Sequence, residues 1–186
     1  MKALFLSILV SKKTIARIFA IGFGWALSIA GPAFAAPSGE LDAAFGDNGR
    51  ATIQLVNSSL GMSVTQQDDG KLLIAGASFT ESGGSDFAVI RLNADGTIDD
   101  TFGSSGNGSV TVDFFQGDDE AMSVVVQPDG RVLLAGWALA TGYDLALARL
   151  SPDGSLDNTF GVTGKVTLDH GGSDEQVSGM LLLDNG

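Results

Sequence analysis

The chain has 186 residues, of which 44% are hydrophobic and only 17% charged, with 26 glycines and no cysteine, so disulfides and thiolate chemistry are excluded. This composition is too apolar for a disordered chain and too rich in glycine for a helical bundle, and it suits short strands joined by tight turns. Residues after 35 carry 6 cations against 22 acids, a net charge of −16, which would repel phosphates, so we expect no nucleic-acid partner.

Residues 1–35 are typical of a secretory signal peptide. Four basic residues and no acid are followed by an apolar run over 18–30 and the small-x-small triplet Ala33-Phe34-Ala35. The run has 13 residues, fewer than the roughly 20 needed to span a bilayer. We therefore expect cleavage between Ala35 and Ala36, no stable membrane insertion afterwards, and a secreted or periplasmic mature chain over residues 36–186.

The mature sequence is built from tandem repeats. A Gly-x-Leu/Ile-Asp-x-x-Phe-Gly segment begins at Gly39, Gly96 and Gly154, which are 57 and then 58 residues apart. A further glycine follows three residues after each Phe-Gly, at Gly49, Gly106 and Gly164. The repeats then run over 39–95 and 96–153, with a truncated third over 154–186.

Each repeat is predicted to contain four strands, which in the middle copy cover 109–115, 121–127, 131–138 and 143–150. The first alternates apolar and polar residues, as a half-buried strand does, whereas the two inner strands are continuously apolar. Pro128-Asp129-Gly130 is a tight-turn sequence that joins these inner strands. The pattern predicts an all-β fold of β-propeller-like tandem four-stranded repeats, about two and a half blades, with a β-solenoid as the alternative.

The combined motifs resemble the delta-60 repeat family. They are Leu-Asp-x-x-Phe-Gly-x-x-Gly, the Gln-x-Asp-Gly-Lys/Arg hairpin, the Ala-Gly strand end and Arg-Leu-x-x-Asp-Gly, over residues 39–186. The resemblance implies an exported bacterial repeat protein with a propeller-like fold and no assigned activity. In the Leu-Asp-x-x-Phe segment we expect one helical turn capped by the aspartate, plugging the space between sheets.

The third repeat stops at Gly186, where its next strand should begin. Half a blade leaves open strand edges, which favour association. We therefore expect either a fragment of a longer propeller or completion by other chains, so that further repeats or self-association supply the partner.

No residue is assigned a catalytic, cofactor-binding or metal-binding role from the sequence. His170 has no partner at a readable spacing and is interpreted as a surface histidine. The Asp-Gly loop after Asn93 is not an EF-hand, because Arg91 and Phe102 occupy positions that require oxygen ligands. The clusters Asp118-Asp119-Glu120 and Asp174-Glu175 are interpreted as solvated turn acids, with weak calcium binding as the alternative.

Two arginines and one tryptophan also stand out. Arg91 and Arg149 end equivalent apolar strands, and we expect each to form an interblade clamp with a nearby aspartate. The candidate partners are Asp42, Asp99 and Asp157. Trp137 is expected to pack in the core or at a strand end, with stacking on a sugar as the alternative.

These observations favour an exported, noncatalytic propeller-type module that binds or scaffolds, with an unknown protein or glycan as ligand and no cofactor. One alternative is a hydrolase or lactonase-like propeller enzyme with acidic metal ligands. The other is a calcium-stabilised structural repeat.

Overall fold

The computed structural model describes residues 5–9, 39–55, 57–81, 83–169, 171 and 174–183. Every helix or strand named within them is a β-strand, and none of these residues lies in a helix long and apolar enough to cross a bilayer. His170 and the expected cleavage position at Ala35 and Ala36 lie outside the described residues.

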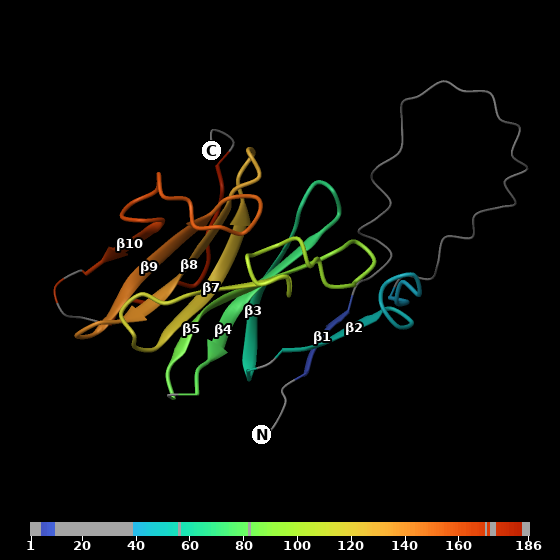
Figure 1. Cartoon of the computed structure of the whole chain (residues 1–186), viewed down its shortest axis with the longest axis horizontal. Coiled ribbons are helices and arrows are strands. Elements are labelled where there is room, and N and C mark those ends of the chain that lie inside the picture. Colours follow the sequence, from blue (N-terminus) through green and yellow to red (C-terminus); the bar gives the residue numbers. More distant parts are fainter. Residues whose placement is uncertain are drawn as a thin grey trace, which may run out of the picture.

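Two four-stranded antiparallel sheets form the body of the molecule (Figure 1). The first has the order β3-β4-β5-β6, and the second has the order β10-β9-β8-β7. The first sheet consists of β3 (Ser59–Gln66), β4 (Leu72–Phe79), β5 (Ser85–Leu92) and β6 (Ser109–Val112). The second consists of β7 (Asp119–Val126), β8 (Val132–Leu139), β9 (Tyr143–Leu150) and β10 (Lys165–Leu168). The predicted all-β fold of repeated four-stranded sheets is confirmed.

The grouping of strands into sheets differs from the prediction. We expected β6 to open the sheet of the middle repeat, but it pairs with β5, Ile90 opposite Ser109, and closes the preceding sheet. β10 closes the second sheet in the same way by pairing with β9. The cause is the path of the loop that precedes each outer strand, because this loop folds back along the strand that comes before it. Arg91 N in β5, for example, donates to Gly108 O in the loop before β6 at 2.9 Å. Each sheet therefore takes its outer strand from the next sequence repeat.

The Leu-Asp-x-x-Phe segment forms a tight turn instead of the expected helical turn. Asp99 still caps it, because its Oδ1 accepts the N–H of Thr101 at 3.2 Å and its carbonyl accepts the N–H of Phe102 at 3.1 Å. Phe102 is fully buried, whereas Ile98 is 39% exposed, so in this copy the phenylalanine fills the core. In the next copy Leu156 also packs against the main core. In this copy Gly108 allows the chain to approach closely, since a Cβ on Gly108 would lie 2.8 Å from Asp99 O.

The main hydrophobic core lies where β7 packs against β3, β4 and β5 of the first sheet. One of its faces comes from Leu73, Ala75, Phe87 and Val89, which are at most 1% exposed. Burying apolar surface contributes roughly 25 cal/mol per Å², so this face-to-face contact dominates the stability of the pair. The burial on both faces predicted for the inner strands of the middle copy is only partly met, since Val124, Val132 and Leu134 are buried but Val125 and Leu133 are half-buried. In β4 of the preceding copy every residue from Leu72 to Ala77 is buried.

A second, smaller core covers the other face of the first sheet. Its residues are Phe45, Ala51, Ile53, Leu72, Ile74, Ile90 and Leu92. Ala51 and Ile53 belong to β2 (Arg50–Gln54), which pairs antiparallel with β1 (Phe5–Leu9). β2 holds the same repeat position as β6 and β10. Among the described residues its one strand partner is β1, which belongs to the predicted signal peptide.

Candidate functional site

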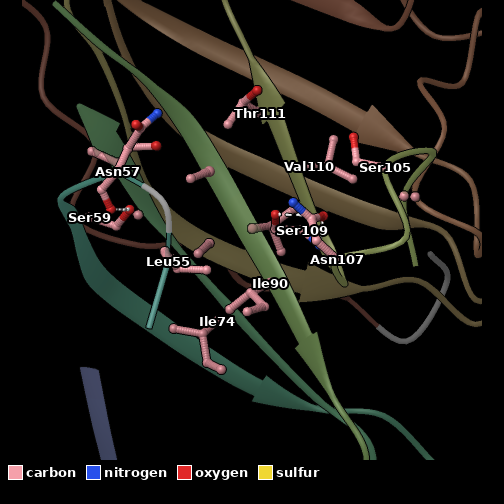
Figure 2. A pocket seen from close by; sticks show the side chains of 18 of the residues that line it. Leu55, Asn57, Ser59, Ile74, Ile90, Ser105, Asn107, Ser109, Val110 and Thr111 are labelled. Carbon is pink, nitrogen blue, oxygen red and sulfur yellow. Dashed lines mark hydrogen bonds between the residues drawn. The ribbon is translucent and has the colours of Figure 1, made fainter. Parts of the chain in front are cut away.

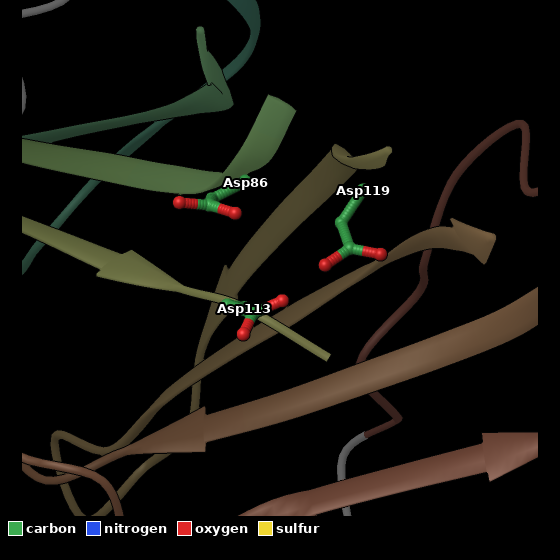
Figure 3. A group of neighbouring side chains, drawn as sticks. All are labelled: Asp86, Asp113 and Asp119. Carbon is green, nitrogen blue, oxygen red and sulfur yellow. The ribbon is translucent and has the colours of Figure 1, made fainter. Parts of the chain in front are cut away.

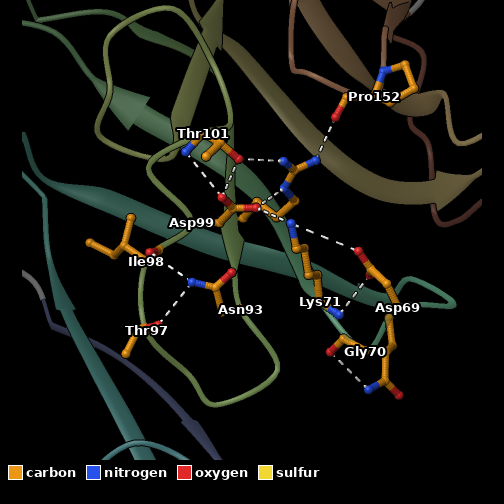
Figure 4. Close-up of polar contacts among 11 residues, drawn as sticks. Asp69, Gly70, Lys71, Asn93, Thr97, Ile98, Asp99, Thr101 and Pro152 are labelled. Atoms are coloured by element: carbon orange, nitrogen blue, oxygen red, sulfur yellow. Dashed lines mark hydrogen bonds and ion pairs between the residues drawn. The ribbon is translucent and has the colours of Figure 1, made fainter.

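A buried ion-pair network lies at the end of β5 (Figure 4). Arg91 Nε donates to Asp99 Oδ2 at 2.7 Å, and Lys71 Nζ donates to the same oxygen at 2.8 Å. Arg91 also donates from Nη1 to the carbonyl of Pro152 at 2.6 Å, and its guanidinium lies 4.5 Å from the centre of the Phe102 ring. Arg91 thus ties its own turn to the Pro-Asp-Gly turn of the next repeat.

The same network recurs at the end of β9. Arg149 Nε and Arg131 Nε donate to Asp157 Oδ2 at 2.8 and 2.9 Å, and Arg149 stacks over Phe160 at 4.6 Å. The predicted pairing of each arginine with an aspartate is therefore confirmed. In the first repeat Asp42 caps its own turn instead, accepting the N–H of Ala44 at 3.1 Å.

Both aspartates of the networks are held ionised. Burial alone would raise the pKa of Asp99, but hydrogen bonds from Lys71, Thr101 and Arg91 outweigh it and hold that pKa well below its ordinary value. Hydrogen bonds from the hydroxyl and N–H of Thr159, together with Arg149, lower the pKa of Asp157 to about 2. These side chains satisfy one another, so the networks serve as structural anchors and leave no group poised for chemistry.

A cavity of about 670 Å³ opens on the first sheet, on the face turned away from the second (Figure 2). Leu55, Ile74 and Ile90 form an apolar floor, and Asn57 and Ser109 lie among the polar residues of its wall. The lining residues carry hydroxyl, amide and aliphatic groups, with Asp153 as their one carboxylate among the described residues.

The equivalent face of the second sheet shows what covers such a surface. The equivalents of the cavity's floor residues Ile74 and Ile90 are Leu134 and Ala148, which belong to the main core between the sheets and are completely buried. The cavity therefore occupies the space where a preceding sheet would pack on the first one.

Trp137 lies on the opposite outer surface of the pair. It alternates along β8 with Leu134 and Ala138, which face the core, so its side chain faces away from the first sheet. Its ring meets Tyr143 edge to face with centroids 4.7 Å apart. The equivalent residue Ala77 is fully buried between the two sheets, which supports packing as the role of this position.

Three carboxylates from different strands meet at the edge between the two sheets (Figure 3). Asp86 lies near the start of β5, Asp113 directly follows β6, and Asp119 begins β7. Each offers an oxygen atom, and these atoms lie within 4.8 Å of one another. The repeat-equivalent residues of the next unit form a second such group: Asp144, Asp169 and Glu175.

The acids Asp118 and Asp119 are neighbours in the sequence but lie in different environments in the structure. Asp118 stays outside the group and accepts the N–H of Ser85 at 3.2 Å, as an ordinary turn acid does. Asp119, interpreted from the sequence as a solvated turn acid, is completely buried. Its two partners lie 33 and 6 residues earlier in the chain, which is why no sequence spacing revealed them. A repeat-to-repeat comparison of acidic positions would have been the only available signal.

Burial and neighbouring charges raise the pKa of two of these acids, Asp119 and Asp86. Burial raises the pKa of Asp119 to about 6, and the charges of Asp113 and Asp86 add to this effect. Burial, followed by the charge of Asp113, raises the pKa of Asp86 as well. The nearest cation, Lys165, donates at 2.7 Å to the backbone carbonyl of Asp113 rather than to a carboxylate.

Face-to-face packing of four-stranded sheets that exchange outer strands between sequence repeats defines a β-propeller-type repeat protein. A family model described as domain of unknown function (DUF5122) beta-propeller matches residues 67–102 and 127–160. Each matched segment runs from the Gln-x-Asp-Gly hairpin to the plugging phenylalanine and includes one complete anchor network. No curated protein sequence matches the chain.

Proposed function

We propose that the chain is an exported, noncatalytic β-propeller-type module of the delta-60 repeat kind, which binds a partner or scaffolds further repeats. The observation that carries this proposal is that the polar side chains found in both units hold strands and units together. Asp99 and Asp157 each accept from two cations, and Arg91 links one repeat to the next. A framework fixed in this way leaves its loops free to vary and to contact a protein or glycan.

Further copies of the repeat are the partner that the outer surfaces fit. The cavity on the first sheet has the place and the apolar floor of an interblade contact. On the other side, residues 174–183 lie along β7 much as β7 lies along β3. Met180 N donates to Ser123 Oγ at 3.0 Å, as Val124 N donates to Ser63 Oγ at 3.3 Å. Either a longer chain or a second chain would supply the covering sheets.

Export and processing are tested by expressing the full chain with a C-terminal tag in a Gram-negative host. The tagged protein is expected in the periplasm or medium with Ala36 as its first residue, established by N-terminal sequencing. Ala35→Arg, which places a bulky cation in a pocket for small side chains, should leave the precursor uncleaved. An intact N-terminus on the exported wild-type protein would contradict the assignment.

The enzyme alternative is tested on the same exported protein. It is incubated with ester, lactone and phosphoester substrates, with Ca²⁺, Mn²⁺ or Zn²⁺ and with a chelator. The proposal expects turnover indistinguishable from buffer in every condition. Hydrolysis that requires a metal ion and is abolished by the chelator would overturn the noncatalytic assignment.

A further inference from the structure

We propose that Asp86, Asp113 and Asp119 hold one divalent cation between the two sheets, and that Asp144, Asp169 and Glu175 hold a second, with Ca²⁺ as the ion that fits best. The proposal does not depend on the binding or scaffold function proposed above. It assigns an ion to a position that recurs wherever one repeat meets the next.

The strongest observation is an orphaned atom at the centre of the first group. Asp119 is completely buried, and its Oδ2 accepts the N–H of Phe114 at 2.7 Å. Its Oδ1 is also buried but has no hydrogen-bond partner. A buried carboxylate oxygen without a partner is costly, and a bound cation is the group that would satisfy it beside two other carboxylates. In Figure 3 the carboxylates of Asp86, Asp113 and Asp119 turn toward one common point.

The second group repeats this feature independently. Glu175 holds the repeat position of Asp119, and its Oε2 is likewise buried without a hydrogen-bond partner. The residue before it is held in the same way in both groups, since Tyr143 N donates to Asp174 Oδ1 at 3.5 Å as Ser85 N donates to Asp118 Oδ1 at 3.2 Å. Two orphaned carboxylate oxygens at equivalent positions indicate one recurring ligand rather than a local accident of packing.

The donor set selects the class of ion. Carboxylate oxygens without nitrogen or sulfur ligands suit hard cations such as Ca²⁺ and Mg²⁺. Ca²⁺ binds oxygen at about 2.3–2.6 Å, so ligands on opposite sides of the ion lie up to about 5 Å apart. The carboxylate oxygens of each group lie within 4.8 Å of one another, so one Ca²⁺ ion can contact all three side chains. Mg²⁺ demands near-ideal octahedral geometry and usually keeps several of its waters, so a site made of three protein carboxylates suits Ca²⁺ better.

The position of the group indicates what the ion does. Asp86 lies in β5 and Asp113 directly follows the neighbouring edge strand β6 of the first sheet, whereas Asp119 begins β7 of the second sheet. One ion would therefore join adjacent sheets and neutralise acids that otherwise repel one another. The equivalent place before β3 has Gln54 and Ser59 instead of Asp113 and Asp119, so we expect no ion there.

The test measures Ca²⁺ binding to the exported chain after chelator treatment, by equilibrium dialysis with labelled Ca²⁺. Two ions should bind per wild-type chain, with dissociation constants on the order of 10⁻⁴ M, as in extracellular modules. Asp119→Asn and Glu175→Gln should each lose one ion, and the double variant should lose both. Asp100→Asn, which removes an exposed carboxylate outside both groups, is the matched control and should bind two.

Thermal unfolding gives a second, independent readout. Ca²⁺ should raise the Tm of the wild-type protein by several degrees, and of the double variant not at all. If Asp119→Asn does not fold, Asp113→Asn tests the same site, because Asp113 is exposed and tolerates the change. The proposal is overturned if the wild-type chain binds no more Ca²⁺ than the double variant, or if Asp100→Asn and Asp119→Asn lose Ca²⁺ equally.

Discussion

Arg91 reaches 61 residues along the chain to donate a 2.6 Å hydrogen bond from Nη1 to the carbonyl of Pro152. Arg149, at the equivalent position, makes the same Asp and Phe contacts with the turn that follows its strand, but its described hydrogen bonds include no counterpart of this one. Among the described contacts, Arg149 therefore has those to its aspartate and phenylalanine, whereas Arg91 has these and a further one to Pro152.

Replacing these arginines with alanine should lower stability unequally. Arg91→Ala leaves Asp99 buried without one of its two cations and removes the link to Pro152, which should lower the free energy of unfolding by about 3 kcal/mol. Arg149→Ala should cost about 1–2 kcal/mol, because its side chain is 21% exposed and lacks that link. Urea unfolding followed by circular dichroism measures both. Equal losses would show that the contact between repeats adds nothing.

Gly154 is expected to tolerate no side chain. Its φ is +91°, and a Cβ would lie 2.7 Å from the backbone nitrogen of Gly103, where two repeats touch. Gly154→Ala should therefore cost about 2–4 kcal/mol, from backbone strain plus displaced backbone. Gly106→Ala is the control, since its φ of +65° imposes strain but nothing lies within 4 Å of a Cβ. Its cost should stay near 1 kcal/mol, and a similar cost for both variants in denaturant unfolding would disprove the steric argument.

In the presence of a chelator, the free energy of unfolding should fall as the pH rises from 4 to 7, because Asp119 loses its proton in this range. Its folded-state pKa of about 6 lies above the ordinary 3.8, so the folded form holds the proton more tightly between these values. The stabilising contribution is complete below pH 4 and is lost above pH 6. Each pKa unit corresponds to about 1.4 kcal/mol, so the loss is at most about 3 kcal/mol. Asp86, Asp113 and the nearby Lys165 face the same group and shape the curve.

Asp119→Asn isolates this effect, because the amide carries no proton that titrates in this range. Relative to wild type, the variant should gain stability at pH 7.5 but not at pH 4.5, measured by urea unfolding in chelator. Asp99 and Asp157 act in the opposite direction, since their lowered pKa values stabilise the fold at neutral pH and this contribution is lost below about pH 4. A wild-type-to-variant difference that is constant with pH would contradict the raised pKa of Asp119.

Trp137 offers a probe of association, because the only other tryptophan of the chain, Trp25, lies in the predicted signal peptide. Its ring is on the outer face of the second sheet, where another repeat would pack. If mature chains cover one another's open faces, its emission should shift to the blue as concentration rises, together with the mass from light scattering. Growth in mass without any change in emission would place the contact elsewhere, for instance on the first sheet.

The repeat pattern predicted the local elements of this fold well. The Pro128-Asp129-Gly130 hairpin and the apolar inner strands depend on turn chemistry and residue periodicity, which are legible in short windows of sequence. The pairing of Arg91 and Arg149 with aspartates was also predictable, since each pair is only 8 residues apart. The pairing of β6 with β5 could not be predicted in this way, because it depends on the path of the loop that precedes β6.

By itself, then, the sequence determined the repeat, the all-β class and the position of each hairpin, since these follow from interactions between residues close in the chain. Only the tertiary structure decided that each sheet borrows its outer strand from the next repeat and that Asp86 and Asp113 converge on Asp119. The physical reason is the same in both cases. Strand pairing and sheet packing bring together residues separated by a whole strand and loop, and the free energy that selects among such arrangements comes from burial of the shared core.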